Sequence, residues 1–204
     1  EKPLIVFRSQ PTPIPVFSNE SDIQFLSYIL AVNDNYDDLS EEQVQSYWKM
    51  REEWEQSNPG FYFRNNWWHW RPLQMLISVF NEAYELHIPE DNLKQLGENG
   101  GGGVKDKGHC EQLAKCFKEF AADMKLNDNK IVYLNTGWWN LKDSNEPSIK
   151  DEVVLEALNA KYPGIFFEQA EVDGKLYAPS HATNLDNIEE FALFLENCNG
   201  FEIY

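Results

Sequence analysis

The chain has 204 residues, of which 42% are hydrophobic and 14% aromatic, a composition that builds a core and excludes global disorder. At this length one domain buries enough apolar area to fold without disulfide or metal staples, so we expect residues 1–204 to form a single domain. Thirty-four acidic and seventeen basic residues give a net charge of −17. Such a charge repels nucleic acid and anionic membrane surfaces, and it attracts a basic partner.

The cysteines and the hydropathy of the chain indicate the cellular compartment. Cys110, Cys116 and Cys198 are an odd number with no CxxC spacing, so they predict neither a disulfide framework nor a zinc knuckle. The first residues carry no apolar segment of signal-peptide length, and the uncharged stretches elsewhere are too short to span a membrane. We therefore expect a cytoplasmic protein without a membrane partner.

The N-terminal quarter of the chain is predicted to hold an arm and two helices. Residues 1–17 are expected to form an extended arm that contributes at most a short edge strand, because prolines at positions 11, 13 and 15 interrupt pairing. A capping box at Ser21 predicts a first helix, and another at Ser40 predicts a second helix that ends near Asn58. One face of this second helix carries a stripe of mostly aromatic residues: Val44, Tyr47, Trp48, Arg51 and Trp54.

Apolar residues at helical spacing predict four further helices. The third helix of the chain starts at Pro72, whose fixed φ suits a first turn, and runs to about Leu86. The next ends near Leu126, and capping residues at Ser148 and Asp186 open the last two. With short strands at 130–134 and within 165–177, the fold class is predicted to be α+β, predominantly helical, with about six helices.

The glycine-rich loop at residues 97–108 invites the interpretation of a phosphate site, but its details argue against one. Val104 follows the last glycine of the run, where a P-loop has lysine and then serine or threonine. His109 and Cys110 are adjacent and do not face each other on a helix, which disfavours a Cys–His nucleophile, and Cys116 is not at a zinc spacing from them. We expect Cys116 in the core and Cys110 pointing away from it. The sequence therefore assigns no catalytic residue, no metal and no cofactor.

The most unusual local composition lies between residues 61 and 72. It includes the run Trp67, Trp68, His69, Trp70 and Arg71. Tryptophan and arginine dominate interface hot spots, and tryptophan also stacks on sugars and bases, so these five residues are candidate binding residues. The alternative is that the rings cover the start of a helix and fill the core. In either case Arg71 is expected to meet a carboxylate or backbone carbonyls, because burying an unpaired arginine is costly.

The same segment, from Phe61 to Leu73, resembles the hallmark of a group of uncharacterised bacterial and phage proteins, in which an FRNN-W-W-W-RPL segment opens a helix. The Asn99–Val104 loop with the helix after it, and the ending from Ile188 to Ile203, are similar to that group's N-D-G…LA and VEEFAEFL…GGFEI segments. The resemblance implies a cytosolic bacterial or phage origin. The group has no established activity, so the resemblance assigns no catalytic residue.

Three functions remain open from the sequence. The first is an acidic binding or neutralising protein, such as an immunity protein or inhibitor of a basic partner. The second is a small hydrolase or transferase whose site is built from dispersed carboxylates and histidines. The third is a sugar- or nucleobase-binding module that uses the tryptophans. We favour the first, because the charge supports it and no catalytic motif supports the second.

If the first function holds, the acidic surface around Ser40 is the best candidate for contact with a basic partner. Asp37, Asp38, Glu41 and Glu42 lie beside the aromatic stripe of the second helix and in the loop before it. Like charges held on one rigid element project a steering field. The alternative is a solvated face that only keeps the protein soluble.

Overall fold

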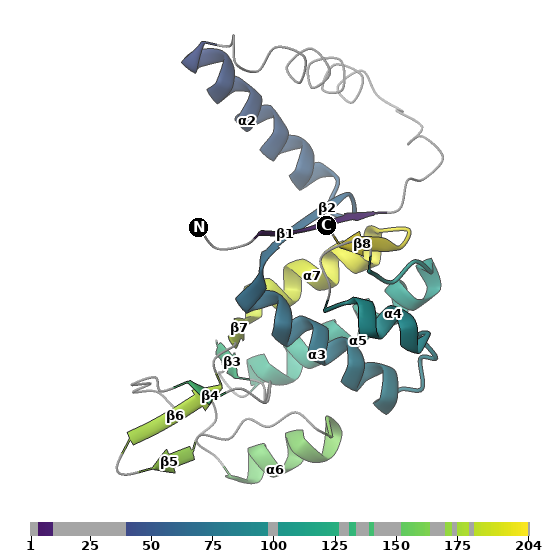
Figure 1. The fold of residues 1–204 in the computed structure, drawn as a ribbon, viewed down its shortest axis with the longest axis vertical. Coiled ribbons are helices and arrows are strands. Elements are labelled where there is room, and N and C mark those ends of the chain that lie inside the picture. The colour runs from purple at the N-terminus through teal and green to yellow at the C-terminus, as the bar shows by residue number, and fades with distance from the viewer. Residues whose placement is uncertain are drawn as a thin grey trace.

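The fold is α+β and predominantly helical, as the sequence predicts (Figure 1). The computed structural model describes residues 4–9, 40–97, 102–126, 131–133, 139–140, 152–163, 170–172, 175–179 and 182–203. The predicted helix after Ser21, the loop residues Asp37 and Asp38, and the middle of the glycine run lie outside the described residues. Within the described residues, no helix combines the length and the apolar character needed to cross a bilayer.

Six helices are described, and they match most of the predicted helical stretches. Their bounds are α2 (Glu41–Ser57), α3 (Trp67–Ala83), α4 (Glu90–Gln95), α5 (Lys107–Leu126), α6 (Glu152–Lys161) and α7 (Leu185–Asn197). Figure 1 shows α3, α5 and α7 packed together as the body of the molecule, with α2 projecting away from it and α6 at the opposite end.

The strands are short and pair in three small sheets. Their bounds are β1 (Leu4–Ser9), β2 (Tyr62–Asn66), β3 (Ile131–Tyr133), β4 (Trp139–Asn140), β5 (Ala170–Val172), β6 (Lys175–Pro179), β7 (Ala182–Asn184) and β8 (Phe201–Ile203). The largest pairing surface is the antiparallel sheet β2-β1-β8, in which Phe7 lies between Phe63 and Ile203. β5 and β6 form the hairpin expected within 165–177.

The core forms where the aromatic faces of α3, α5 and α7 meet. Phe191 of α7 lies edge-to-face against Phe117 of α5 at 5.2 Å and against Trp70 of α3 at 5.7 Å between ring centroids. Phe63 of β2 joins the same cluster at 5.0 Å from Phe191, so the sheet packs on the helices through this ring. Edge-to-face pairs of this kind add about 0.5–1.5 kcal/mol each beyond the area they bury.

The second half of the glycine-rich loop is packed against β8. The backbone N–H of Phe201 donates to the carbonyl of Val104 at 2.8 Å, and that of Ile203 donates to Gly102 at 2.6 Å. These two hydrogen bonds, from β8 to Gly102 and Val104 and called the clasp below, hold β8 along the edge that faces away from β1. A Cβ atom at Gly103 would lie 2.0 Å from the carbonyl oxygen of Phe201, so the close approach requires glycine there.

Three predicted boundaries need correction. β1 is an internal strand and not an edge, because the prolines of the arm, at positions 3, 11, 13 and 15, all lie outside residues 4–9 and leave both sides of these residues able to pair. α3 begins at Trp67 and carries Pro72 in its interior, because Asn66 caps the helix: its Oδ1 accepts from the N–H of His69 at 3.1 Å. α7 begins at Leu185, since Asn184 caps it in place of Asp186.

Candidate functional site

The aromatic candidates of the segment around Trp70 divide between core and surface. The side chain of Trp70 is 0% exposed, and its indole N–H donates to the carbonyl of Leu96 at 2.9 Å. His69 is exposed at the start of the same helix. The side chains of Trp67 and Trp68 lie outside the described part. Trp70 is therefore a core residue, as the core-filling alternative predicted, and it is not available to a ligand.

Arg71 is half-buried beside this core. Its guanidinium donates to the side-chain carbonyl of Gln74 at 3.2 Å, one turn further along α3. Burial lowers the pKa of Arg71 from its ordinary value. Arg71 is thus partnered by an amide oxygen.

The two asparagines before the tryptophans have structural roles. Asn66 caps α3, and Asn65, which is 5% exposed, donates through Nδ2 to Oδ1 of Asn187 at 3.1 Å. Asn187 in turn donates to the hydroxyl of Thr183 at 2.7 Å. This chain of bonds ties β2 to the start of α7, so the polar part of the motif satisfies buried groups at a junction of the fold.

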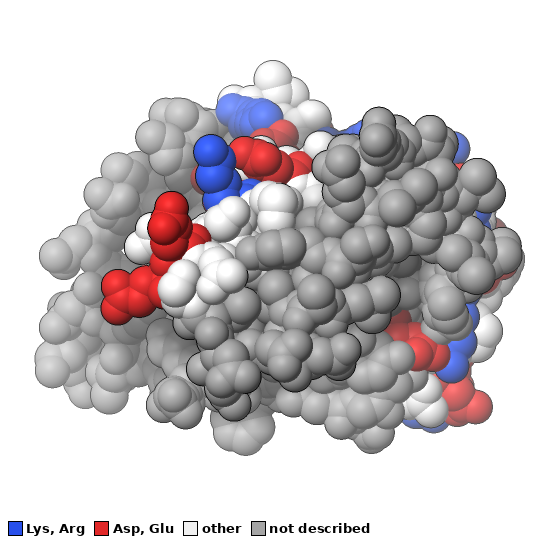
Figure 2. All heavy atoms as spheres, turned by 90° about the horizontal axis from the view of Figure 1, so that it is seen from above, with Lys and Arg blue, Asp and Glu red and all other residues white. Residues whose placement is uncertain are grey.

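Glu41 and Glu42 lie in the first turn of α2, and both are exposed. Ser40 caps the helix in the predicted capping box: its hydroxyl accepts from the N–H of Gln43, whose side chain accepts from the N–H of Ser40 at 2.9 Å. Glu41, Glu42 and Glu52 make no ion pair with any residue in the described ranges. Figure 2 shows basic side chains beside the acidic ones on the described part of this face. The negative charge of α2 therefore comes from an excess of glutamate over the lysine and arginine of the same helix.

Arg51 of α2 contacts the sheet β2-β1-β8 through Tyr62 of β2. Its guanidinium lies over the ring of Trp48 at 5.5 Å and over that of Tyr62 at 5.4 Å, and its Nε donates to Oε1 of Glu55 at 2.8 Å. Burial would lower the pKa of Arg51, but the hydrogen bond and charge of Glu55, together with Tyr47, raise it above its ordinary value. Arg51 therefore remains a fixed cation with its charge neutralised locally.

The aromatic stripe of α2 is only partly covered. Tyr47 is its one buried member, at 7% exposure, whereas Trp48 is 48% exposed. Near the C-terminal end of α2, Trp54 packs edge-to-face at 4.5 Å on Phe61, which follows the helix and is itself 45% exposed. A helix that leaves large aromatic side chains uncovered beside charged ones has the composition of an interface and not of a purely solvated face.

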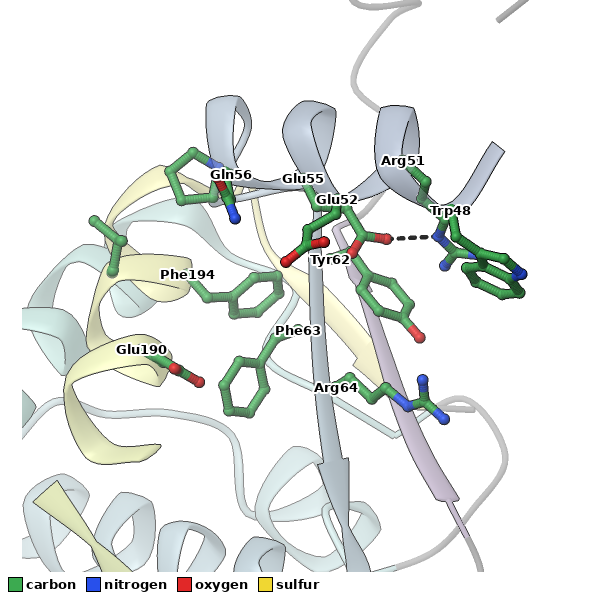
Figure 3. Close-up of a pocket in the computed structure, with 12 residues that line it drawn as sticks. Trp48, Arg51, Glu52, Glu55, Gln56, Tyr62, Phe63, Arg64, Glu190 and Phe194 are labelled. Carbon is green, nitrogen blue, oxygen red and sulfur yellow. Dashed lines mark hydrogen bonds and ion pairs between the residues drawn. The ribbon is translucent and has the colours of Figure 1, made fainter. Parts of the chain in front are cut away.

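A groove of about 760 Å³ lies where α2, β2 and α7 meet (Figure 3). It is lined by Trp48, Arg51, Glu52, Glu55, Gln56, Pro59, Tyr62, Phe63, Arg64, Glu190, Leu193 and Phe194. Figure 3 shows Phe63 and Phe194 pointing into the space between β2 and α7, while Arg64 extends to the other side of β2. The groove thus combines an apolar floor with carboxylates on α2 and α7.

The sequence pointed to α2 but not to the groove. Its other walls come from residues about 10 and 140 positions further along the chain, as the bounds of β2 and α7 show. The single signal that could have indicated it is Leu193, an apolar residue off the buried stripe of α7, which is 45% exposed.

The cysteines and histidines do not build a reactive centre in the described ranges. All three thiols are reduced and buried, and no group of three or more described His, Cys, Asp or Glu residues is arranged to hold a metal ion. Contrary to prediction, Cys110 is buried like Cys116, because the segment before α5 and the end of α7 cover it. Its thiol donates to the carbonyl of Val104 at 3.5 Å, and its interaction with the thiol of Cys198, followed by burial, raises the pKa of Cys110. A buried thiol with a raised pKa is a poor nucleophile.

Comparison of the chain with protein-family models, with curated proteins and with solved structures finds no match.

Proposed function

We propose that this protein binds a basic protein partner through α2 and the groove beside it, as an immunity protein or inhibitor of that partner would. The observation that carries the proposal is the half-exposed ring of Trp48 on a projecting helix whose Glu41, Glu42 and Glu52 have no ion-pair partner among the described residues. An aromatic anchor on a helix with an excess of glutamate suits an interface that steers a cationic partner and then buries the ring.

Helix stability explains only some of the glutamates on α2. Glu41 and Glu42 in the first turn interact favourably with the helix dipole. Glu55 lies in the last turn, where negative charge is unfavourable, and no basic residue lies in that turn, whereas Glu52 and Glu53 lie before it. The pairs Lys49–Glu53 and Arg51–Glu55 offset part of this cost, and Glu52 has no such compensation among the described residues. A role in attracting a cationic partner accounts for Glu52.

The net charge of −17 supports the same function at the scale of the whole chain. A field of this sign speeds encounter with a basic protein at low ionic strength and slows encounter with an acidic one. Trp70, one of the aromatic candidates for stacking on a sugar or nucleobase, belongs to the core, and the side chains of Trp67 and Trp68 lie outside the described part. The net charge thus supports a basic protein partner, and Trp70 gives no support to a stacking module.

Affinity capture from the source lysate tests this proposal. The parent protein and a variant with Glu41→Gln, Glu42→Gln and Glu52→Gln serve as bait at about 50 mM and about 500 mM salt. We expect the parent to retain a basic protein at low salt, and the variant to retain at least fivefold less of it. Recovery of no basic protein, or equal recovery by parent and variant, contradicts the proposal.

A further inference from the structure

The edge of β2 opens into the groove. β2 is an end strand of the sheet β2-β1-β8, and among the described strands it pairs with β1 alone. Figure 3 shows β1 on one side of β2, and the groove with α7 beyond it on the other. A strand edge of this kind presents backbone N–H and C=O groups with which an extended chain can pair. Five residues, Tyr62–Asn66, give an edge about 17 Å long.

The walls of the groove suit the alternating side chains of an extended segment. Phe63 and Phe194 lie 5.8 Å apart between ring centroids at its floor. Leu193, 45% exposed, and Trp48, 48% exposed, lie at its margins on α7 and α2. Side chains of a strand point alternately to opposite faces, so every second residue of a segment paired with β2 reaches this apolar surface.

The charges that line the groove determine which segment fits. Arg51 is neutralised by Glu55 at 2.8 Å, and Arg64 extends to the far side of β2 (Figure 3). Glu52 on α2 and Glu190 on α7 are exposed and make no ion pair within the described part of the chain. Arg64 nevertheless lines the groove, so its walls carry three carboxylates against two arginines. This excess of negative charge complements lysine or arginine in the occupant.

We propose that the groove binds an extended, basic segment of the partner protein, which adds to the sheet as a strand along the free edge of β2. Apolar side chains of the segment pack on Leu193 and Phe194, and its lysine or arginine side chains reach Glu190 and Glu52. In this mode the main-chain hydrogen bonds supply affinity, and the groove selects the side chains. The inference rests on the proposed function, because it names how that partner is held.

A synthetic heptapeptide of alternating lysine and valine, blocked at both ends, tests strand addition with a defined probe. Two further versions of the peptide carry backbone N-methyl groups. In the first version every valine is N-methylated, and in the second the inner lysines are. Each version therefore loses the backbone N–H donors along one edge of the strand while keeping its side chains and charge. Affinity is measured by calorimetry, and amide exchange of residues 62–66 by NMR. We expect the parent peptide to bind and to slow exchange in β2, and one methylated version to bind at least tenfold more weakly. Equal binding of all three peptides, no binding of the parent peptide, or unchanged exchange in β2 overturns the inference.

A charge reversal in the groove tests the same inference from the side of the protein. Glu190→Lys should weaken binding of the parent peptide at least fivefold, whereas Glu156→Lys, the same change on an exposed residue of α6 at the other end of the molecule, should change it less than twofold. Equal effects of the two variants overturn the inference.

The capture experiment with the α2 variant separates the two proposals. If that variant loses the basic partner while neither N-methylation of the peptide nor Glu190→Lys weakens peptide binding, strand addition is wrong and the proposed function stands. If the variant retains the partner in full, the proposed function is wrong.

Discussion

Trp70 shows most clearly how a single residue of this chain is committed to the core. Its ring is fully buried against Phe191, and its indole N–H bonds to Leu96 across the gap between α3 and α4. From the sequence, Trp70 could belong either to the core or to a binding site, because a tryptophan next to an arginine occurs in both. Burial decides between them, and burial depends on which helices pack against α3.

Replacing Trp70 should therefore cost stability and not binding. Trp70→Ala is expected to lower the free energy of unfolding by about 3–5 kcal/mol through lost burial and the cavity left behind. Denaturant unfolding followed by circular dichroism measures the change. His69→Ala, at the exposed neighbouring position, is the control and should stay within about 0.5 kcal/mol of the parent. A Trp70→Ala protein as stable as the parent would show that the ring is not part of the core.

Tyr162 gives a pH dependence at the residue scale. Its buried hydroxyl donates to Asp123 at 2.6 Å, and burial, followed by this bond, raises the pKa of Tyr162. Above about pH 10 the folded protein keeps a proton that the unfolded chain releases. The stability that the Tyr162 hydroxyl contributes is therefore fully present below about pH 10, and it is lost as the pH rises above this value.

Tyr162→Phe should accordingly have a shallower loss of stability between pH 9.5 and 11 than the parent, by up to about 1.4 kcal/mol per pH unit. The thiol of Cys116, whose pKa burial raises to about 11, contributes a loss of the same sign in both proteins and cancels in the comparison. Urea unfolding at several pH values measures both slopes. Parallel slopes would mean that the phenol ionises as readily in the folded state as in the unfolded chain.

At the scale of elements, most of the helices could be predicted and the sheet could not. Capping boxes and apolar stripes are local signals, and they located α2 and the C-terminal end of α5 to within a few residues. The sheet joins residues 4–9 to residues about 60 and 200 positions along the chain, and no local pattern specifies such pairing. The clasp of Gly102 and Val104 on β8 was missed for the same reason.

The cap of α2 should act on that helix alone. Ser40→Ala removes the hydroxyl that accepts from Gln43, at a cost of about 1 kcal/mol. Because α2 projects from the body, we expect amide exchange within α2 to quicken about fivefold while the melting temperature changes by less than about 2 °C. Hydrogen exchange with mass spectrometry measures the first quantity. A large fall in melting temperature would mean that α2 unfolds together with the body.

A glycine within the clasp and a glycine just after it should respond to alanine very differently. A Cβ atom at Gly103 would collide with the backbone of Phe201, so Gly103→Ala should destabilise the protein by more than about 2 kcal/mol. Gly108 lies in the first turn of α5, where the nearest atom to a new Cβ is Oδ1 of Asp106 at 3.0 Å, which also accepts from the N–H of His109. Gly108→Ala should therefore change stability by less than about 1 kcal/mol, because the gain in helix propensity is offset by the displacement of this carboxylate. Equal melting temperatures of the two variants would contradict the packed clasp.

At the scale of the whole molecule, charge, helix and groove combine at one end. The sequence indicated the acidic excess and the aromatic stripe of α2, since both are properties of a continuous segment. It could not place Glu190 and Leu193 beside them, because α7 reaches β2 only through the folded body. The candidate site is thus half predictable: the acidic helix α2 could be foreseen from the sequence, and the groove beside it could not.

The most direct test of a surface that steers a basic partner is the dependence of the association rate constant on ionic strength, measured by stopped flow with the basic protein recovered by capture. The variant carrying Glu41→Gln, Glu42→Gln and Glu52→Gln is compared with a matched variant in which the exposed Glu82, Glu85 and Glu156 become glutamine. Both lose three charges, so any difference reports their position. We predict that the α2 variant associates at least tenfold more slowly at about 20 mM salt with a flatter salt dependence, while the matched variant stays within threefold of the parent. Identical rate constants for the two variants would contradict the assignment of α2 as the binding surface.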